Sequence, residues 1–105
     1  MEYTREIAKI ERTYLGFEDH GNLTGMLHVH YGDAGQGIGG YTIKTVAGDY
    51  LHRTLRACGV NTWEELKGRT IYVLTDANRR VVGIENLPTE QGEQFLFADV
   101  FGDPS

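Results

Sequence analysis

Residues 32–41 constrain this chain most, because five of these ten residues are glycine. Glycine adds no side chain to a core and loses more conformational freedom on folding than any other residue. Such a run indicates backbone that turns sharply or comes close to a ligand or another subunit. We interpret the stretch as a glycine-rich loop, either a β-turn with a bulge or a close strand approach, or a nest of exposed amides that holds an anion.

Three of these glycines, Gly35, Gly37 and Gly40, also fit the G-x-G-x-x-G spacing of dinucleotide-binding sites. That motif needs a helix directly after it, with the helix N-terminus aimed at the pyrophosphate. The residues that follow, 41–46, are instead β-branched and alternating, which predicts a strand. We therefore do not expect a dinucleotide site of this kind.

Length and composition indicate one small globular domain over residues 1–105. Its core is modest, and oligomerisation would help to stabilise it. The formal net charge of -5 argues against binding a nucleic acid polymer, because that affinity depends on a surplus of Lys and Arg. Cys58 is the one cysteine, the first residues resemble no signal peptide, and no apolar run suits a membrane. We expect an intracellular protein that does not bind membranes.

Two segments before the glycine stretch predict strands. Residues 23–31 alternate apolar and polar side chains, which is typical of a half-buried strand. We interpret residues 7–17 as their hairpin partner across the turn-forming residues 18–22, although the apolar positions of 7–17 also fit a helical spacing.

The apolar period changes from two to about 3.6 near Asp49, which we expect to be the N-cap of a helix. Apolar side chains then share one face as far as Cys58, and Gly59 would end the helix. Thr62 and Glu65 have the spacing of a capping box, which predicts a second, short helix.

Residues 69–75 and 80–85 predict a second hairpin around the turn at 76–79. Residues 94–101 are apolar enough to form either a last strand or a short helix, and the sequence does not decide which. The order of elements indicates an α+β fold, namely an antiparallel β-sheet with two short helices between strands, in an oligomeric protein.

No catalytic or metal-binding constellation is evident from spacing. His28 and His30 place two imidazoles on one strand face, but a metal site needs further ligands, and no carboxylate follows at a suitable spacing. Cys58 falls on the apolar face of its helix, away from His52, so it is interpreted as a core residue. We therefore expect no metal, no cofactor and no enzymatic activity.

A basic stripe is more informative. His52, Arg53 and Arg56 lie on the polar side of the predicted helix, where guanidinium groups could bind phosphate or could pair with acidic neighbours. Asn86 follows a predicted strand, and its amide can both donate to and accept from a base or ribose.

Five blocks of the chain together resemble a phage protein family, namely residues 15–21, 31–32, 35–41, 63–68 and 83–86. Their joint occurrence in this order resembles the type 1 Thoeris anti-defence proteins. The resemblance implies a sponge that sequesters cyclic ADP-ribose isomers without cleaving them, in the cytoplasm of the infected bacterium. It also implies homodimers that assemble into hexamers in many members, with binding of CBASS cyclic di- or trinucleotides at a separate site in some.

The resemblance makes Asn86 and Arg53 ligand contacts, since both match family positions. The full set of expected ligand-binding residues is Asn86, Arg53, Arg56, His20, Gln36, Gly37, Gly39 and Tyr41. The chain departs from the family at Ile38, where a Phe is expected, and has no Lys or Arg after Arg80. The alternative functions are an enzyme that degrades a nucleotide signal and a phage protein that inhibits a host protein by direct contact.

Overall fold

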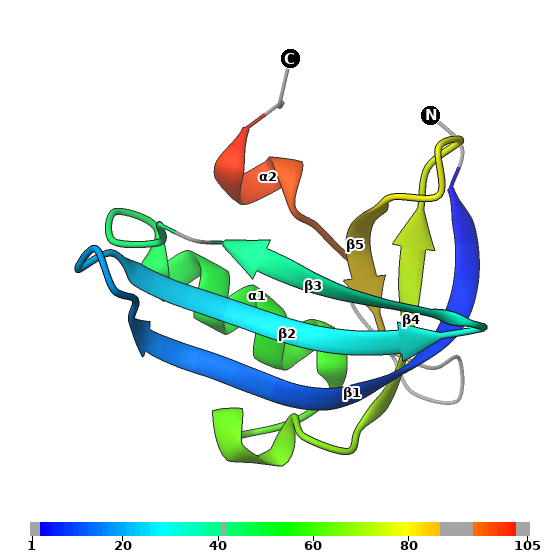
Figure 1. Ribbon diagram of the computed structural model, residues 1–105, viewed down its shortest axis with the longest axis horizontal. Helices are drawn as coiled ribbons and strands as arrows, with labels where there is room; N and C mark the ends of the chain where they lie inside the picture. The colour runs from blue at the N-terminus through cyan, green and yellow to red at the C-terminus, as the bar shows by residue number, and fades with distance from the viewer. Residues whose placement is uncertain (1–2, 41, 87–93, 103–105) are drawn as a thin grey trace.

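Six antiparallel strands form a curled sheet in the computed structural model, which describes residues 3–40, 42–86 and 94–102 (Figure 1). The strands are β1 (Thr4–Phe17), β2 (Leu23–Tyr31), β3 (Ala34–Gly40), β4 (Thr70–Thr75), β5 (Val81–Glu85) and β6 (Gln94–Leu96). The helices are α1 (Ala47–Cys58), the 3-10 helix η1 (Trp63–Glu65) and α2 (Ala98–Phe101). The strand order is β3-β2-β1-β4-β5-β6, so the predicted α+β class with an antiparallel sheet is confirmed.

The long strand β1 joins the two parts of the sheet. Its residues 4–9 pair with β4, whereas residues 9–17 pair with β2. The register with β2 shifts between Ile10 and Arg12, which marks a β-bulge. Because a bulge bends its strand and increases the local twist, β1 can belong to both the β1–β3 part and the β4–β6 part of the curled sheet.

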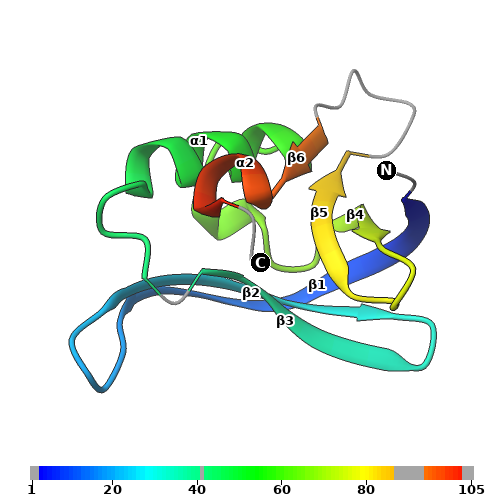
Figure 2. The same ribbon diagram turned by 90° about the horizontal axis from the view of Figure 1, so that it is seen from above.

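The helices cover one face of the sheet (Figure 2). Leu27 and Val29 of β2 and Ile10 of β1 point into a core that also contains Tyr50 and Ala57 of α1, each at most 1% exposed. Among the described residues, no helix lies on the opposite face of β1, β2 and β3, which we call the outer face. Separately, no helix of the described residues is long and apolar enough to cross a membrane.

The interpretation of residues 32–41 as a loop is wrong for residues 34–40, which form the edge strand β3. The turn itself is shorter and lies at Gly32 and Asp33, where Gly32 has a φ of 57°. The pairing of β3 with β2 places Ile38 opposite the core residue Leu27 and Gly37 opposite His28 on the outer face. One side of β3 therefore contributes Ile38 to the core, whereas its outer side consists of glycine and carries no side chains.

The predicted strand at 41–46 is also wrong: residues 42–46 are irregular and turn-forming, and Tyr41 lies outside the described residues. β3 already occupies the available edge of β2, so the chain leaves the sheet here and crosses to the helix layer. Ile43 explains why this segment has the apolar pattern of a strand. Its side chain is fully buried, and its amide donates to the Leu23 carbonyl over 2.9 Å.

The helix predictions hold in part. α1 begins at Ala47 rather than after Asp49. Asp49 is not the N-cap, since it lies within the first turn and pairs with Arg53, and no side chain caps the helix. Gly59 ends α1 as predicted, in a left-handed conformation with φ of 69°. The predicted capping box is present, but it opens the 3-10 turn η1 rather than an α-helix.

Within the described ranges only one α-helix therefore lies between strands, and the second, α2, follows β6. The described residues of the 94–101 segment form both a short strand and a short helix, rather than one of the two.

Candidate functional site

The outer face of β1 and β2 carries matched pairs of side chains. Alternation along each strand places Arg12 opposite His28 and Tyr14 opposite Met26 across the two strands. Directly opposed side chains on one face of an antiparallel pair lie about 4.5–5.5 Å apart at Cβ, close enough to act on one ligand.

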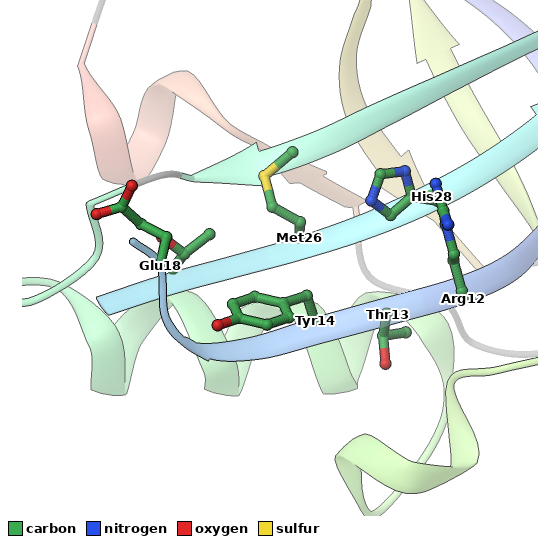
Figure 3. Close-up of a pocket in the computed structure, with 7 residues that line it drawn as sticks. Arg12, Thr13, Tyr14, Glu18, Met26 and His28 are labelled. Carbon is green, nitrogen blue, oxygen red and sulfur yellow. The ribbon is translucent and has the colours of Figure 1, made fainter. Parts of the chain in front are cut away.

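Two open hollows adjoin on this face. The first has a volume of about 380 Å³, and Figure 3 shows its lining side chains standing on β1 and β2. The second, of about 480 Å³, extends across β2 to the backbone of Gly35 and Gly37 on β3. Arg12 and His28 line both hollows, so these two side chains lie at the centre of a continuous surface.

The glycines of β3 leave the third strand of this surface bare. A Cβ added at Gly37 would lie 3.3 Å from both His28 Cε1 and Met26 Cε. The His28 ring and the end of Met26 therefore lean over the β3 backbone, as Figure 3 shows. A ligand on this side of His28 can approach main-chain amides directly, which a side chain at Gly37 would hinder.

The charge of Arg12 is uncompensated within the described part of the chain. Arg5, Arg53, Arg79 and Arg80 each form an ion pair with a carboxylate, but no such pair is found for Arg12. Its guanidinium instead faces the imidazole of His28 across the strand pair. A guanidinium with an imidazole N–H beside it suits phosphate oxygens.

Tyr14 supplies a flat aromatic surface beside this pair. Its hydroxyl donates to the carbonyl of Phe17, and its ring lies over Gly16, where an added Cβ would be 3.5 Å from the Tyr14 oxygen. The ring is thereby held along the strand with 43% of the residue exposed. The Cα atoms of Arg12 and Tyr14 are two residues apart on one strand, or about 7 Å, and the Tyr14 ring points further along the strand, away from Arg12 (Figure 3). A nucleotide that offers its base to the ring and its phosphate to the guanidinium would have to span more than this distance.

Glu18 closes the end of the first hollow. Its Oε1 accepts the backbone N–H groups of Asn22 at 3.0 Å and of His20 at 2.7 Å, and its Oε2 lies 3.0 Å from the His20 ring. The hydrogen bond from Asn22, followed by that from the His20 ring, holds the pKa of Glu18 below its usual value. Glu18 is thus an ionised acceptor, suited to hydroxyl groups and unsuited to donating a proton.

The structure does not gather the predicted ligand residues into one place. Gln36 and Gly37 line the second hollow, and Gly39 lies beside them on β3, while Tyr41 lies outside the described residues. His20 lies in the loop between β1 and β2 with 86% of its side chain exposed. Gln36 also accepts a hydrogen bond from the Tyr31 hydroxyl at 2.9 Å.

Arg53, Arg56 and Asn86 lie away from the outer face. Both arginines belong to α1, on the helix side of the sheet, and Arg53 pairs with Asp49 at 2.9 Å. This pairing agrees with the interpretation of the basic stripe as a helix face paired with acidic neighbours.

Asn86 is 6% exposed at the end of β5. Its Nδ2 would be 2.3 Å from a Cβ added at Gly59, and Nη2 of Arg69 would be 3.0 Å from the same point. Arg69 donates from Nε to the Cys58 carbonyl at 2.9 Å, so it helps to satisfy the end of α1. Asn86 therefore packs against the C-terminal turn of α1.

Cys58 lies in the core as predicted, and burial raises the pKa of its thiol to about 12. A thiol in that state is a poor nucleophile and a poor metal ligand. Within the described residues, no group of three or more His, Cys, Asp and Glu side chains could hold a metal ion.

Sequence reasoning missed Arg12, Tyr14 and Met26. The signal was the alternation of Arg12, Tyr14 and Gly16 with Thr13 and Leu15, but the competing helical spacing of residues 7–17 obscured which side chains share a face.

No protein-family model matches this chain, and searches of curated proteins and of solved structures find no match either.

Proposed function

We propose that this protein is a phage anti-defence sponge, which binds a cyclic ADP-ribose isomer and holds it without cleaving it. The class of ligand follows from the resemblance to type 1 Thoeris anti-defence proteins. The structural observation that supports binding is Arg12, for which no ion pair is found within the described residues, opposite His28 and beside the fixed and exposed ring of Tyr14. The protein would act in the cytoplasm of the infected bacterium.

The ligand's chemistry suits this surface. Cyclic ADP-ribose carries two phosphates, which the guanidinium of Arg12 and the imidazole of His28 can contact with N–H donors. Its adenine can stack on Tyr14, since base-to-aromatic stacking contributes about 1–3 kcal/mol. Glu18, as an ionised acceptor, suits the ribose hydroxyls.

The same residues favour holding the ligand over cleaving it. General acid catalysis requires a group that gives up a proton near neutral pH, and the lowered pKa of Glu18 works against that role. Cys58 is buried in the core with its pKa raised to about 12. An enzyme that degrades the signal is therefore the second candidate, and an inhibitor that acts by contact with a host protein is the third.

An oligomer belongs to this proposal. The two hollows are large enough for a small molecule, since such sites usually have about 300–1,000 Å³, but they are open surfaces rather than enclosed cavities. A second protomer would enclose the ligand. We propose a homodimer, which in turn can assemble into hexamers and offer a separate site for cyclic di- or trinucleotides.

The test is calorimetric titration of the protein with glycocyclic ADP-ribose, followed by heat release and mass analysis of the ligand. We expect tight binding and recovery of the intact ligand. Arg12→Gln should weaken binding by about 10- to 100-fold, because a hydrogen bond to a charged group contributes about 1.5–3 kcal/mol. The matched control is Arg79→Gln, which removes the same charge from the turn between β4 and β5.

The other outcomes separate the alternatives. Linear ADP-ribose after incubation would identify an enzyme, and no binding of any cyclic nucleotide would leave only the contact inhibitor. Tight binding that Arg12→Gln leaves intact but Arg53→Gln or Asn86→Ala weakens would keep the sponge and move its site to the helix side.

A further inference from the structure

The second half of β1 has a free edge. Residues 4–9 pair with β4, and Ile10 still exchanges backbone hydrogen bonds with Arg69 at 2.9 Å and Gly68 at 2.7 Å. From residue 11 to residue 17, β1 pairs with β2 alone among the described residues. Figure 1 shows this half of β1 as one border of the β1–β2–β3 part of the sheet.

This edge is protected only at its start. Free edge strands are commonly kept short or carry charged residues, Pro or a β-bulge, which discourage pairing with another chain. The β-bulge, Glu11 and Arg12 lie at one end of this edge, and residues 13–17 carry none of these features. The other two edge strands of the described sheet differ from this edge. β6 is short, with three residues, and β3 is rich in flexible glycine, which weakens strand pairing. Residues 11–17 read Glu-Arg-Thr-Tyr-Leu-Gly-Phe, with neither Lys nor Pro and with strong strand formers.

Large apolar side chains are exposed along the same edge. Tyr14 is 43% exposed on the outer face, and Leu15 and Phe17 are 41% and 70% exposed on the helix side. They make up three of the five exposed large hydrophobic residues in the described part of the chain, so apolar exposure is concentrated at the unpaired backbone. Both features indicate a surface that another strand covers.

We propose that this edge pairs antiparallel with the same edge of a second copy, across a two-fold axis at Leu15. An antiparallel pair of identical strands is isologous, so one stretch serves as both partners. Charge complementarity selects the axis: with Leu15 opposite itself, Arg12 faces Glu18 of the partner subunit. In the same register, Tyr14 comes opposite Gly16 of the partner subunit, next to the ring of the partner's Tyr14, which lies over that glycine.

The helix side of the interface is also complementary. Thr13 accepts a hydrogen bond from Trp63 Nε1 at 3.1 Å, so the indole of η1 lies beside this position. With the axis at Leu15, Phe17 of the partner subunit comes opposite Thr13 and next to this indole. The most exposed large hydrophobic residue in the described part of the chain is thereby covered by an aromatic neighbour.

The pairing would join the two outer faces into one surface with two Arg12–His28 pairs related by the axis. The five N–H donors of Arg12 allow it to contact a carboxylate on the edge side and a phosphate on the His28 side. This inference rests on the oligomer of the proposed function and names its interface, but it does not depend on which ligand is bound.

Cysteine crosslinking tests the register. Directly opposed residues in an antiparallel pair have Cα atoms about 4.5–5.5 Å apart, within the range of a disulfide. We expect Leu15→Cys to form a covalent dimer under mild oxidation. The matched control is Ile7→Cys, an exposed apolar residue of the same strand in the half that pairs with β4, which should stay monomeric on a non-reducing gel.

A charge at the axis tests the interface without oxidation. Leu15→Lys places two ammonium groups opposite each other, so light scattering should show the dimer's dissociation constant rising by about 100-fold or more, with an unchanged circular dichroism spectrum. Ile7→Lys should leave the dimer intact. A dimer insensitive to Leu15→Lys and not crosslinked by Leu15→Cys would overturn the interface. A protein that binds cyclic ADP-ribose as a monomer would overturn the interface and the oligomer while leaving the sponge in place.

Discussion

Gly39 offers the sharpest test of how the glycine stretch works. Its φ is 120°, a conformation that other residues rarely adopt, and this turns the position of a Cβ toward the core. An added Cβ would lie 2.3 Å from the Gly25 carbonyl oxygen and 2.5 Å from the Tyr50 hydroxyl. These two groups are already joined, because the buried Tyr50 hydroxyl donates to the Gly25 oxygen at 2.8 Å.

The expected cost of Gly39→Ala follows from three contributions. Backbone strain at such a position is about 1–3 kcal/mol. Overpacking against the Gly25 backbone and the Tyr50 ring adds about 1–3 kcal/mol. Loss of the Tyr50 hydrogen bond adds about 1 kcal/mol. The free energy of unfolding should therefore fall by about 3–7 kcal/mol, a large part of the roughly 5–15 kcal/mol typical of a native protein.

The control is Gly37→Ala, two residues away on the same strand. A Cβ there would meet the flexible ends of His28 and Met26 at 3.3 Å, which can move aside. We expect a change in unfolding free energy below about 1 kcal/mol. Urea unfolding of both variants, followed by circular dichroism, measures the difference. If Gly39→Ala unfolds within 1 kcal/mol of the unchanged protein, which is the limit set for the control, the argument from close packing fails.

Three further predictions concern single residues. The pKa of Cys58 rises from 9.0 to about 12 on folding, so its contribution to stability is complete below pH 9 and is lost between pH 9 and 12, at up to about 1.4 kcal/mol per pH unit. In urea unfolding at alkaline pH, Cys58→Ala should flatten this fall in the free energy of unfolding. A fall that already starts at neutral pH would contradict the prediction. Asn86→Ala should lower the free energy of unfolding by about 1–3 kcal/mol even without ligand, because its buried amide packs at the end of α1; unchanged stability with weaker ligand binding would instead assign Asn86 to the ligand. Thr62→Ala should cost about 1 kcal/mol in thermal or urea unfolding by removing the capping box with Glu65, and a cost near zero would show that η1 does not depend on its cap.

Local pattern alone predicted much of the fold. The alternation of residues 23–31 identified β2, the left-handed preference of glycine identified the end of α1 at Gly59, and the spacing of Thr62 and Glu65 identified the capping box. Each of these depends on residues within a turn or two of one another, so the sequence contains the whole interaction.

The start of α1 was harder, because Asp49 is a good capping residue that the structure uses differently. Its carboxylate pairs with Arg53 one turn later, while Val46 takes the cap position with no side-chain bond. Both arrangements satisfy the acidic preference of a first helical turn, and composition does not distinguish them.

The sequence by itself determined that this chain forms an antiparallel α+β fold, because the change of apolar period from two to about 3.6 and back is a local property. Only the tertiary structure decided that residues 34–40 form a strand, since glycine has no strand preference and β3 exists because β2 offers it an edge. The tertiary structure also decided the candidate site, because Arg12 and His28 lie far apart in the chain and meet only through the register of β1 with β2. A shift of one residue in that register would have turned one of them to the core face.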